Sequence, residues 1–380
     1  MKRILSLLLC CALAFGLAAC GGQTGPVVSD YGSASSAPSS ASDTDDASEA
    51  SGKTDSDAVS DAVVFDPGIE HQILVCDIMN HSVVQLDLNV CNGDYKLLRE
   101  ESAVVWEWDA DEDPNCHLKP GSGIDDAKIR YSPYYEKDVV IATSSGGKAY
   151  VVDYENRTVL WETSQSNGPH SIEMMPNGDV VVAGSGGSNW EAAGSLVYYP
   201  LSTGAVGRGH EYSVPSCHGV QWDPVQEVLW VLGYYGVEAL VVKDGRLSPV
   251  SGLSVEFDGD VGGHDLAPVY GQPGKYWVTA HKYLWLFDSV EMTLVNRYEY
   301  SNRLSEKNLK GVASFADGTM VQCVANVGSD LHATWSTKAL RILWPQRTDG
   351  KVSKVKMEDS TIMFSDREFY KVHTFCKDYQ

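Results

Sequence analysis

The stretch Pro169–Glu173, with the sequence PHSIE, leads through the turn Pro-Asn-Gly-Asp at 176–179 into Val180–Gly184, with the sequence VVVAG. Two short runs of strand-forming residues around a turn of this composition predict a pair of antiparallel strands. The same pattern recurs along the chain, and this repetition decides which fold the sequence predicts. The other pairs of runs are 126–130 with 139–142, 217–221 with 229–233, 263–266 with 276–279, and 310–313 with 320–323.

The leading residues of four of these repeats are evenly spaced. His170, His218, His264 and Lys310 are separated by 48, 46 and 46 positions. Each repeat continues with a third apolar run, such as Ala149–Asp153, and often with a fourth. Four short antiparallel strands in about 40–50 residues are typical of a β-propeller blade. A pair of β-sandwiches would also be all-β, but it would not explain the even spacing.

The two ends of the repeat region complement each other. The first repeat, made of Ile73–Asp77, Val83–Leu88 and Val104–Trp108, lacks an inner strand. The segment Glu368–Phe375 is a lone strand without partners in its own repeat, so it can supply the missing strand and close the ring. We therefore predict an all-β, six-bladed β-propeller. Seven blades remain an alternative, because residues 345–366 have no clear strand pattern.

The N-terminus has the features of a bacterial lipoprotein signal peptide. Lys2 and Arg3 precede the apolar segment Ile4–Leu17, and the sequence Leu-Ala-Ala-Cys ends at Cys20. This order of basic, apolar and small residues predicts a cleaved export signal, and the apolar run is too short to span a bilayer. Its resemblance to lipoprotein signal peptides implies removal of residues 1–19 and lipidation of Cys20. We expect a lipid-anchored protein on the outer side of a bacterial cell membrane.

Residues 20–62 form a segment of different composition. They are rich in Ser, Ala, Asp and Gly and contain almost no large apolar side chain. Such a segment cannot bury enough apolar surface to offset its ordering entropy, so it is predicted to be a disordered linker. A long acidic tether of this kind suggests a Gram-positive cell wall. The domain organisation is therefore a signal peptide at 1–19, a lipid-anchored linker at 20–62 and a propeller domain at 63–380.

The composition excludes one class of function. The 380 residues include 29 Lys and Arg against 51 Asp and Glu, a formal net charge of −22. Phosphate contacts need a basic surface, so we do not expect a nucleic-acid-binding protein. The hydrophobic fraction of 43% is enough to form a core.

Several stretches occur in an order that resembles a known family. They are Val105–Trp108, Asp125–Lys128, Thr143–Gly147, Pro169–Ser171, Val181–Ser185, Cys217–Asp223, Gly262–Leu266 and Phe369–Val372. Over residues 71–375 the chain resembles an uncharacterised family of secreted bacterial propellers, a domain-of-unknown-function family, and its first blade resembles those of NHL-type propellers. Ala127 departs from the family pattern, because many relatives have cysteine there. The resemblance implies the fold but no particular function, because propellers host unrelated chemistries.

The repeated histidines are the first candidate site. The inner strands of a propeller line its central channel, so His170, His218 and His264 are predicted to surround one mouth of that channel. Neutral imidazole binds Zn, Mn, Fe or Ni, and a three-histidine site would leave coordination positions open for water or substrate. A divalent transition metal is therefore a possible cofactor. Alternatively, the histidines hydrogen-bond to the backbone of neighbouring blades and serve only to close the ring.

Basic residues extend this predicted mouth. Lys310 occupies the equivalent position in the sixth blade, and Lys128 or Arg130 in the second, while Asp265 lies beside the ring. A cationic funnel in an otherwise acidic protein would attract anions such as uronates, sulfated sugars or phosphorylated metabolites. Alternatively, Lys128 and Arg130 only pair with nearby acids.

Three functions remain open from the sequence. The first is a binding module that captures an extracytoplasmic ligand, such as an anionic carbohydrate, at the mouth. The second is a metal-assisted lyase or hydrolase that uses the three histidines. The third is a scaffold that docks another cell-envelope protein. The chain has no nucleophile elbow, HExxH motif or EF-hand loop, so an enzymatic function rests on the predicted ring alone.

Overall fold

The computed structural model describes residues 70–189, 191–204, 207–296, 304, 307–348 and 351–380. The expected signal peptide, the lipidation site Cys20 and the linker lie outside the described residues. No helix within the described ranges is long and apolar enough to cross a membrane.

Six four-stranded antiparallel sheets form the fold. The first is β24 (Phe369–Thr374), β1 (Gln72–Asp77), β2 (Ser82–Asp87) and β3 (Val104–Asp109). The second is β4 (Asp126–Ser132), β5 (Lys137–Ser144), β6 (Lys148–Asp153) and β7 (Thr158–Ser164). The third is β8 (Pro169–Met174), β9 (Val180–Gly184), β10 (Ser195–Tyr199) and β11 (Glu211–Ser213).

The remaining three sheets have the same order. The fourth is β12 (Gly219–Asp223), β13 (Val228–Leu232), β14 (Gly236–Lys243) and β15 (Arg246–Glu256). The fifth is β16 (Asp265–Pro268), β17 (Lys275–Thr279), β18 (Leu284–Asp288) and β19 (Thr293–Asn296), and the sixth is β20 (Leu309–Ser314), β21 (Met320–Val324), β22 (Ala339–Thr348) and β23 (Lys351–Met363). The short helices are η1 (Leu88–Cys91), η2 (Tyr95–Leu97), α1 (Glu100–Ala103), η3 (Gly187–Asn189) and η4 (Leu201–Thr203).

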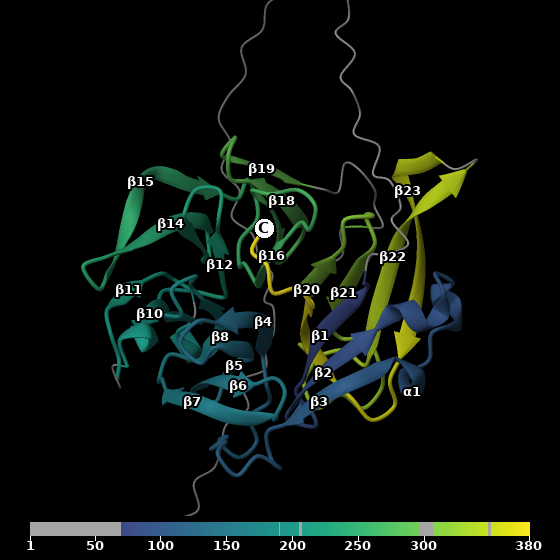
Figure 1. Cartoon of the computed structure of the whole chain (residues 1–380). Helices are drawn as coiled ribbons and strands as arrows, with labels where there is room; N and C mark the ends of the chain where they lie inside the picture. The colour runs from purple at the N-terminus through teal and green to yellow at the C-terminus, as the bar shows by residue number, and fades with distance from the viewer. Residues whose placement is uncertain (1–69, 190, 205–206, 297–303, 305–306, 349–350) are drawn as a thin grey trace, which may run out of the picture. The chain divides into compact units, whose positions relative to one another are not determined.

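The sheets are blades around a common axis, with β4, β8, β12, β16 and β20 nearest to it (Figure 1). The sixth inner strand is β24, which pairs antiparallel with β1 and places Ile73 opposite Thr374 and Val75 opposite Val372. The predicted six blades and the closure of the ring by the C-terminal strand are therefore confirmed, and the described residues form no seventh blade. The weakly patterned residues 345–366 fall mostly in the hairpin of β22 and β23, at the outer side of the sixth blade.

Alternating residues of a blade strand face two different neighbouring blades. In β1, Ile73 and Val75 pack into a cluster shared with the sixth blade, whereas Leu74 and Cys76 pack into a cluster shared with the second. Both faces are buried, which is why the sequence of the strand is continuously apolar rather than alternating. The core consists of such layers between blades.

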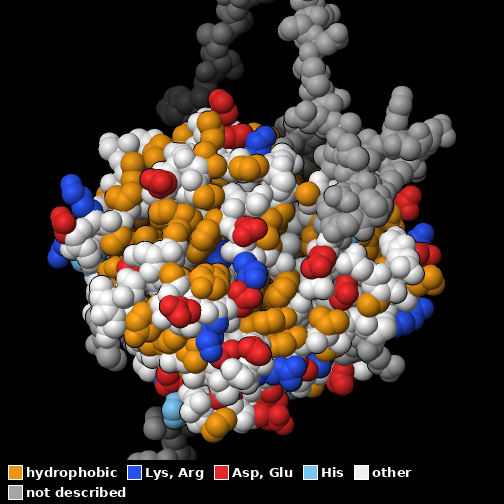
Figure 2. Space-filling model, viewed as in Figure 1, with side chains coloured by type: hydrophobic (Ala, Val, Ile, Leu, Met, Phe, Trp, Pro, Cys, Tyr) orange, Lys and Arg blue, Asp and Glu red, His pale blue; other side chains and the backbone are white. Residues whose placement is uncertain are grey.

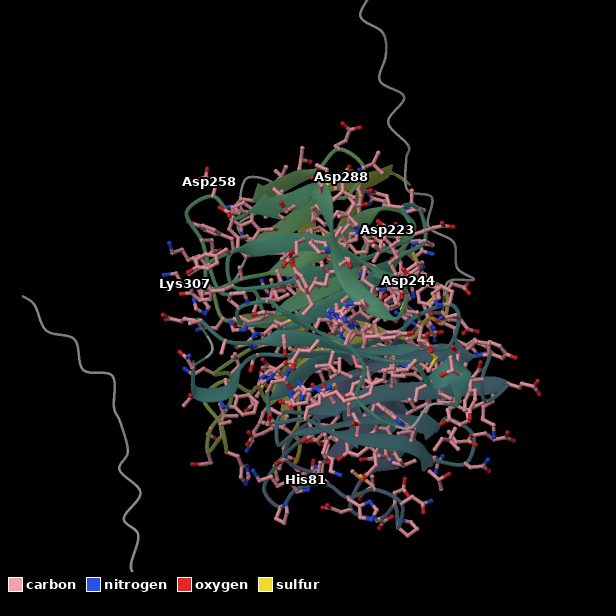
Figure 3. The ribbon with its side chains drawn as sticks, turned by 90° about the vertical axis from the view of Figure 1, so that its left-hand side faces the viewer. His81, Asp223, Asp244, Asp258, Asp288 and Lys307 are labelled. Carbon is pink, nitrogen blue, oxygen red and sulfur yellow. The ribbon has the colours of Figure 1, made fainter. Side chains whose placement is uncertain are left out.

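Buried polar groups also join neighbouring blades. The carboxylate of Asp223, labelled in Figure 3, accepts a hydrogen bond from Trp230 Nε1 at 2.8 Å within the fourth blade. The same carboxylate accepts a bond from Ser289 Oγ of the fifth blade, also at 2.8 Å. On the outer surface seen in Figure 2, acidic and basic side chains are interspersed with apolar ones.

Candidate functional site

An equivalent backbone hydrogen bond immediately precedes three of the inner strands. The N–H of His218 donates to Leu232 O at 3.0 Å, and the N–H of His264 donates to Thr279 O at 2.8 Å. In the second blade the N–H of Asp125 makes the corresponding bond, to Thr143 O at 2.8 Å. Asp125, rather than a basic residue, therefore takes the position of the histidines in that blade.

His170 and Lys310, which lead the third and sixth blades, lie at shifts in the register of strand pairing. The register of β8 against β9 shifts between Pro169 and Ser171, and that of β20 against β21 shifts between Leu309 and Gly311. His170 and Lys310 are the residues skipped by these shifts. A bulge re-aims a side chain, and here both side chains join those of the other blades at one end of the channel.

The structure brings the three predicted histidines together. The ring centroids of His170 and His218 lie 4.5 Å apart, and those of His218 and His264 lie 5.5 Å apart. His281, from the turn after β17, adds a fourth ring, 5.2 Å from that of His264. Tyr370, at the start of β24, packs edge-on against His170 with a centroid distance of 6.2 Å.

A cavity of about 330 Å³ opens beside these rings. Small residues create the space: Gly262 has a φ of +70°, and a Cβ there would lie 2.5 Å from the His281 ring. The walls therefore consist of imidazole rings, serine hydroxyls and glycine backbone, and most of their exposed surface is carbon with a few polar atoms among it. The lining residues are Ser145, Gly168, His170, Ser185, Gly187, Ser216, His218, Gly262, Gly263, His264 and His281.

Backbone carbonyls fix the tautomer of two of these histidines. His170 Nδ1 lies 2.8 Å from Gly168 O, and His218 Nδ1 lies 2.9 Å from Ser216 O. A carbonyl can only accept, so Nδ1 carries the proton in both rings and Nε2 keeps its lone pair. Each Nε2 can then accept a proton or bind a metal ion.

The electrostatics of the site keep these imidazoles neutral. Burial lowers the pKa of His170 to about 4. Burial and the neighbouring His170 hold the pKa of His218 well below its usual value, and burial together with Lys310 does the same for His264. At neutral pH the rings therefore act as hydrogen-bonding groups rather than as cations.

Lys310 is a cation in direct contact with one of these rings. Its Nζ lies 2.9 Å from His264 Nε2, so the ammonium donates to the neutral imidazole. Burial and the positive charge of Lys371 lower the pKa of Lys310 to about 8. Among the described residues, no carboxylate oxygen lies within 4.0 Å of this nitrogen.

The three histidines do not converge as a ready metal site. Among the residues that the structure describes, the single group of three or more possible ligands within 4.8 Å of one another is Asp126, Asp265 and His373. A metal bound through His264 Nε2 would require Lys310 to leave that atom. The cluster of Asp126, Asp265 and His373 already has a cationic partner, since Lys371 Nζ lies 3.5 Å from Asp265 Oδ1.

Lys128 and Arg130 lie deeper in the channel than the histidines. Lys128 is buried and its Nζ donates to Ile172 O at 2.9 Å and Val220 O at 2.7 Å. Arg130 is also buried and forms a two-point pair with Glu173 at 2.7 and 2.9 Å. The structure thus separates these two residues from the cavity and gives each of them buried partners.

Sequence reasoning missed the side chains that close the channel below the cavity. Lys371 is fully buried, and its Nζ donates to His170 O at 2.9 Å and His218 O at 2.8 Å. His373 Nε2 lies 2.5 Å from Asp126 Oδ1, and although burial raises the pKa of Asp126, Lys371 and His373 hold it well below its usual range. The signal was present in the alternation of β24, where residues 371 and 373 face one side.

The fold and this polar channel define a six-bladed β-propeller whose candidate site is at one channel mouth. Residues 98–323 match the family described as "Family of unknown function (DUF6528)", which is more than half of the chain. The chain belongs to that family, as its sequence resemblance implied. No curated protein sequence matches it.

Two solved structures illustrate the similarity to other proteins. Hydrazine synthase from Kuenenia stuttgartiensis is 14% identical over 70% of this chain and 70% of that chain, with a TM-score of 0.44. The Cps50 (Swd1) β-propeller domain from Myceliophteria thermophila is 13% identical over 76% of this chain and 86% of that chain, also with a TM-score of 0.44.

Proposed function

We propose that this protein is an extracytoplasmic binding module that takes an anionic carbohydrate, of the uronate class, at the histidine-lined mouth. The observation that carries the proposal is the half-buried Lys310 ammonium, which is hydrogen-bonded to His264 of the cavity lining and has no carboxylate partner among the described residues. A ligand carboxylate would supply the missing charge, and a charge-assisted hydrogen bond is stronger than a neutral one.

The polar groups of the cavity lining suit the hydroxyl groups of a sugar. Nε2 of His170 and Nε2 of His218 can accept hydrogen bonds from a ligand, while the hydroxyls of Ser145, Ser185 and Ser216 can donate or accept. A volume of about 330 Å³ falls at the small end of the range for ligand pockets, which favours one sugar ring over a long chain. We further propose that lipidation of Cys20 holds this module on the outer side of the membrane.

The test compares glucuronate with its neutral analogue glucose by isothermal titration calorimetry. We expect wild type to bind glucuronate, and Lys310→Met to lose roughly ten- to a hundredfold in affinity, the value of one charged hydrogen bond. Lys275→Met is the matched control, because Lys275 lies on the fifth blade and pairs with Asp288 at 3.6 Å. Equal affinity for glucuronate and glucose, or an unchanged affinity in Lys310→Met, would contradict the proposal.

A second candidate, a metal-assisted lyase or hydrolase, is favoured by one observation. Metal-binding histidines commonly donate their other ring N–H to a carbonyl, and both His170 and His218 do so here. The check is elemental analysis of untagged protein after reconstitution with Zn²⁺ or Mn²⁺. Less than about a tenth of an equivalent of metal per chain would rule this candidate out.

A further inference from the structure

The three lysines of the channel have different partners. Lys128 and Lys371 each donate to two backbone carbonyls and lie within 4.0 Å of a carboxylate oxygen. Lys310 makes neither kind of contact among the described residues, and its hydrogen-bond partner there is His264 Nε2. The Lys310 side chain is therefore hydrogen-bonded to a neutral imidazole, and no carboxylate among the described residues pairs with it.

The neighbouring strand adds a second positive charge. Lys371 belongs to β24, which packs directly against β20, and a Cβ on Gly311 would lie 3.0 Å from Lys371 Cα. Burial and the charge of Lys371 disfavour the protonated form of Lys310 and lower its pKa to about 8. A desolvated lysine beside another cation is a known way to obtain a neutral, nucleophilic amine near neutral pH.

We propose that the Lys310 amine captures small polyhydroxy aldehydes or ketones that enter the cavity, by forming a Schiff base with their carbonyl carbon. The ligand class follows from the lining, because serine hydroxyls and imidazole nitrogens can bind the hydroxyl groups of an open-chain sugar. This inference uses the cavity of the proposed function but does not depend on a ligand carboxylate.

The step balances with groups that are present. Near pH 8 part of the Lys310 population has released its proton to water, and the nitrogen lone pair of this neutral amine attacks the carbonyl carbon. His264 Nε2 can take the proton that the nitrogen loses after attack and pass it to the former carbonyl oxygen. A C–N bond forms while the carbonyl oxygen takes up a proton, giving a carbinolamine. The nitrogen lone pair then forms the C=N bond as the protonated hydroxyl leaves as water. The net reaction is amine plus carbonyl to imine plus water, with no oxidant or reductant.

The experiment traps the imine. The full-length protein is incubated with glyceraldehyde and cyanoborohydride, which reduces the imine to a stable secondary amine, and labelled lysines are mapped by peptide mass spectrometry. At pH 7.5 we expect Lys310 to label at least about tenfold faster than Lys275, because burial and Lys371 lower the pKa of Lys310 to about 8, whereas Lys275 is in an ion pair with Asp288. The rate at Lys310 should rise with pH to a midpoint near 8.

Two variants separate this inference from the proposed function. Lys310→Arg keeps the positive charge, so it should still bind glucuronate while losing the fast label. His264→Gln can accept the hydrogen bond from Lys310 but cannot relay a proton, so labelling should slow while its midpoint stays near pH 8, because burial and Lys371 set that pKa. Labelling of Lys310 no faster than that of Lys275 in wild type would overturn the inference, and glucuronate binding in the same preparation would leave the proposed function standing.

Discussion

Asp125 is a buried carboxyl group that takes the position of a histidine in the second blade. It is 1% exposed, and it accepts a hydrogen bond from the N–H of Ser145. Burial nevertheless raises its pKa to about 7. The folded state therefore binds a proton at pH values where the unfolded chain has already released it, so ionised Asp125 destabilises the fold above pH 7.

Asp125→Asn should remove this cost and keep an acceptor for the Ser145 N–H. We expect the variant to be more stable than wild type by about 2 kcal/mol or more at pH 8. The advantage should shrink as the pH falls from 7 towards 4, where the carboxyl of the unfolded chain also becomes protonated. Urea unfolding at pH 8 and pH 4.5 measures both values, and an equal gain at the two pH values would argue against a buried ionised carboxylate.

His170 contributes with the opposite dependence on pH. Its folded-state pKa of about 4 lies below the unfolded value of 6.5, so between these values the unfolded chain binds the extra proton. Its contribution to stability is therefore lost progressively as the pH falls from 6.5 to 4. His170→Asn should reduce the loss of stability over this interval by about 2 kcal/mol, measured by urea unfolding at pH 7 and pH 4.5. If His170→Asn and wild type lost the same free energy of unfolding between pH 7 and pH 4.5, His170 would not be a buried neutral imidazole.

At the level of single residues, the sequence predicted part of the site. His170, His218, His264 and Lys310 could be found because each begins a repeat, and a repeat position is visible without a structure. Asp125 could not be recognised, because its equivalence rests on a backbone hydrogen bond to Thr143. Lys371 and His373 belong to the strand that closes the ring, and their place in the channel depends on contacts with blades distant in sequence.

At the scale of elements, the contact between β20 and β24 depends on a missing side chain. A Cβ on Gly311 would lie 2.8 Å from Val372 N and 3.0 Å from Lys371 Cα, which are backbone atoms that cannot turn away. Gly311→Ala should therefore push the two inner strands apart and lower the free energy of unfolding by about 1–3 kcal/mol. Urea unfolding measures this change, and faster amide exchange in β24 should accompany it. A variant as stable as wild type would mean that the two strands separate at no cost.

Most strands could be predicted because both faces of each inner strand are buried, so their sequences are short apolar runs between turns. The hairpin of β22 and β23 was harder to predict, because Lys351–Met363 mixes Lys, Asp, Ser and Thr with few apolar residues. It lies at the outer side of its blade, where burial constrains the sequence least. Prediction of strands from apolar patterns therefore works best near the axis and worst at the rim.

At the scale of the whole molecule, the proposed lipid anchor makes a prediction about location. Cys20→Ala removes the thiol that would carry the lipid, so the protein should appear in the culture medium or as an unprocessed precursor. Cell fractionation with metabolic palmitate labelling measures both outcomes. Continued palmitate labelling of the Cys20→Ala protein would show that the lipid, if present, is attached elsewhere. The propeller should keep its stability in this variant, since Cys20 lies outside the described residues that form it.

The pairing of β24 with β1 also sets the order in which the molecule can be completed. A ribosome makes β1, β2 and β3 early, but their inner neighbour Phe369–Thr374 is made only after the other five blades. Until then the first blade has an open edge, and the second to sixth blades can form from local contacts while the circle stays unjoined. The slow step in maturation should therefore be a single long-range docking event, and a nascent chain released before residue 369 would expose two unpaired blade surfaces to chaperones and proteases.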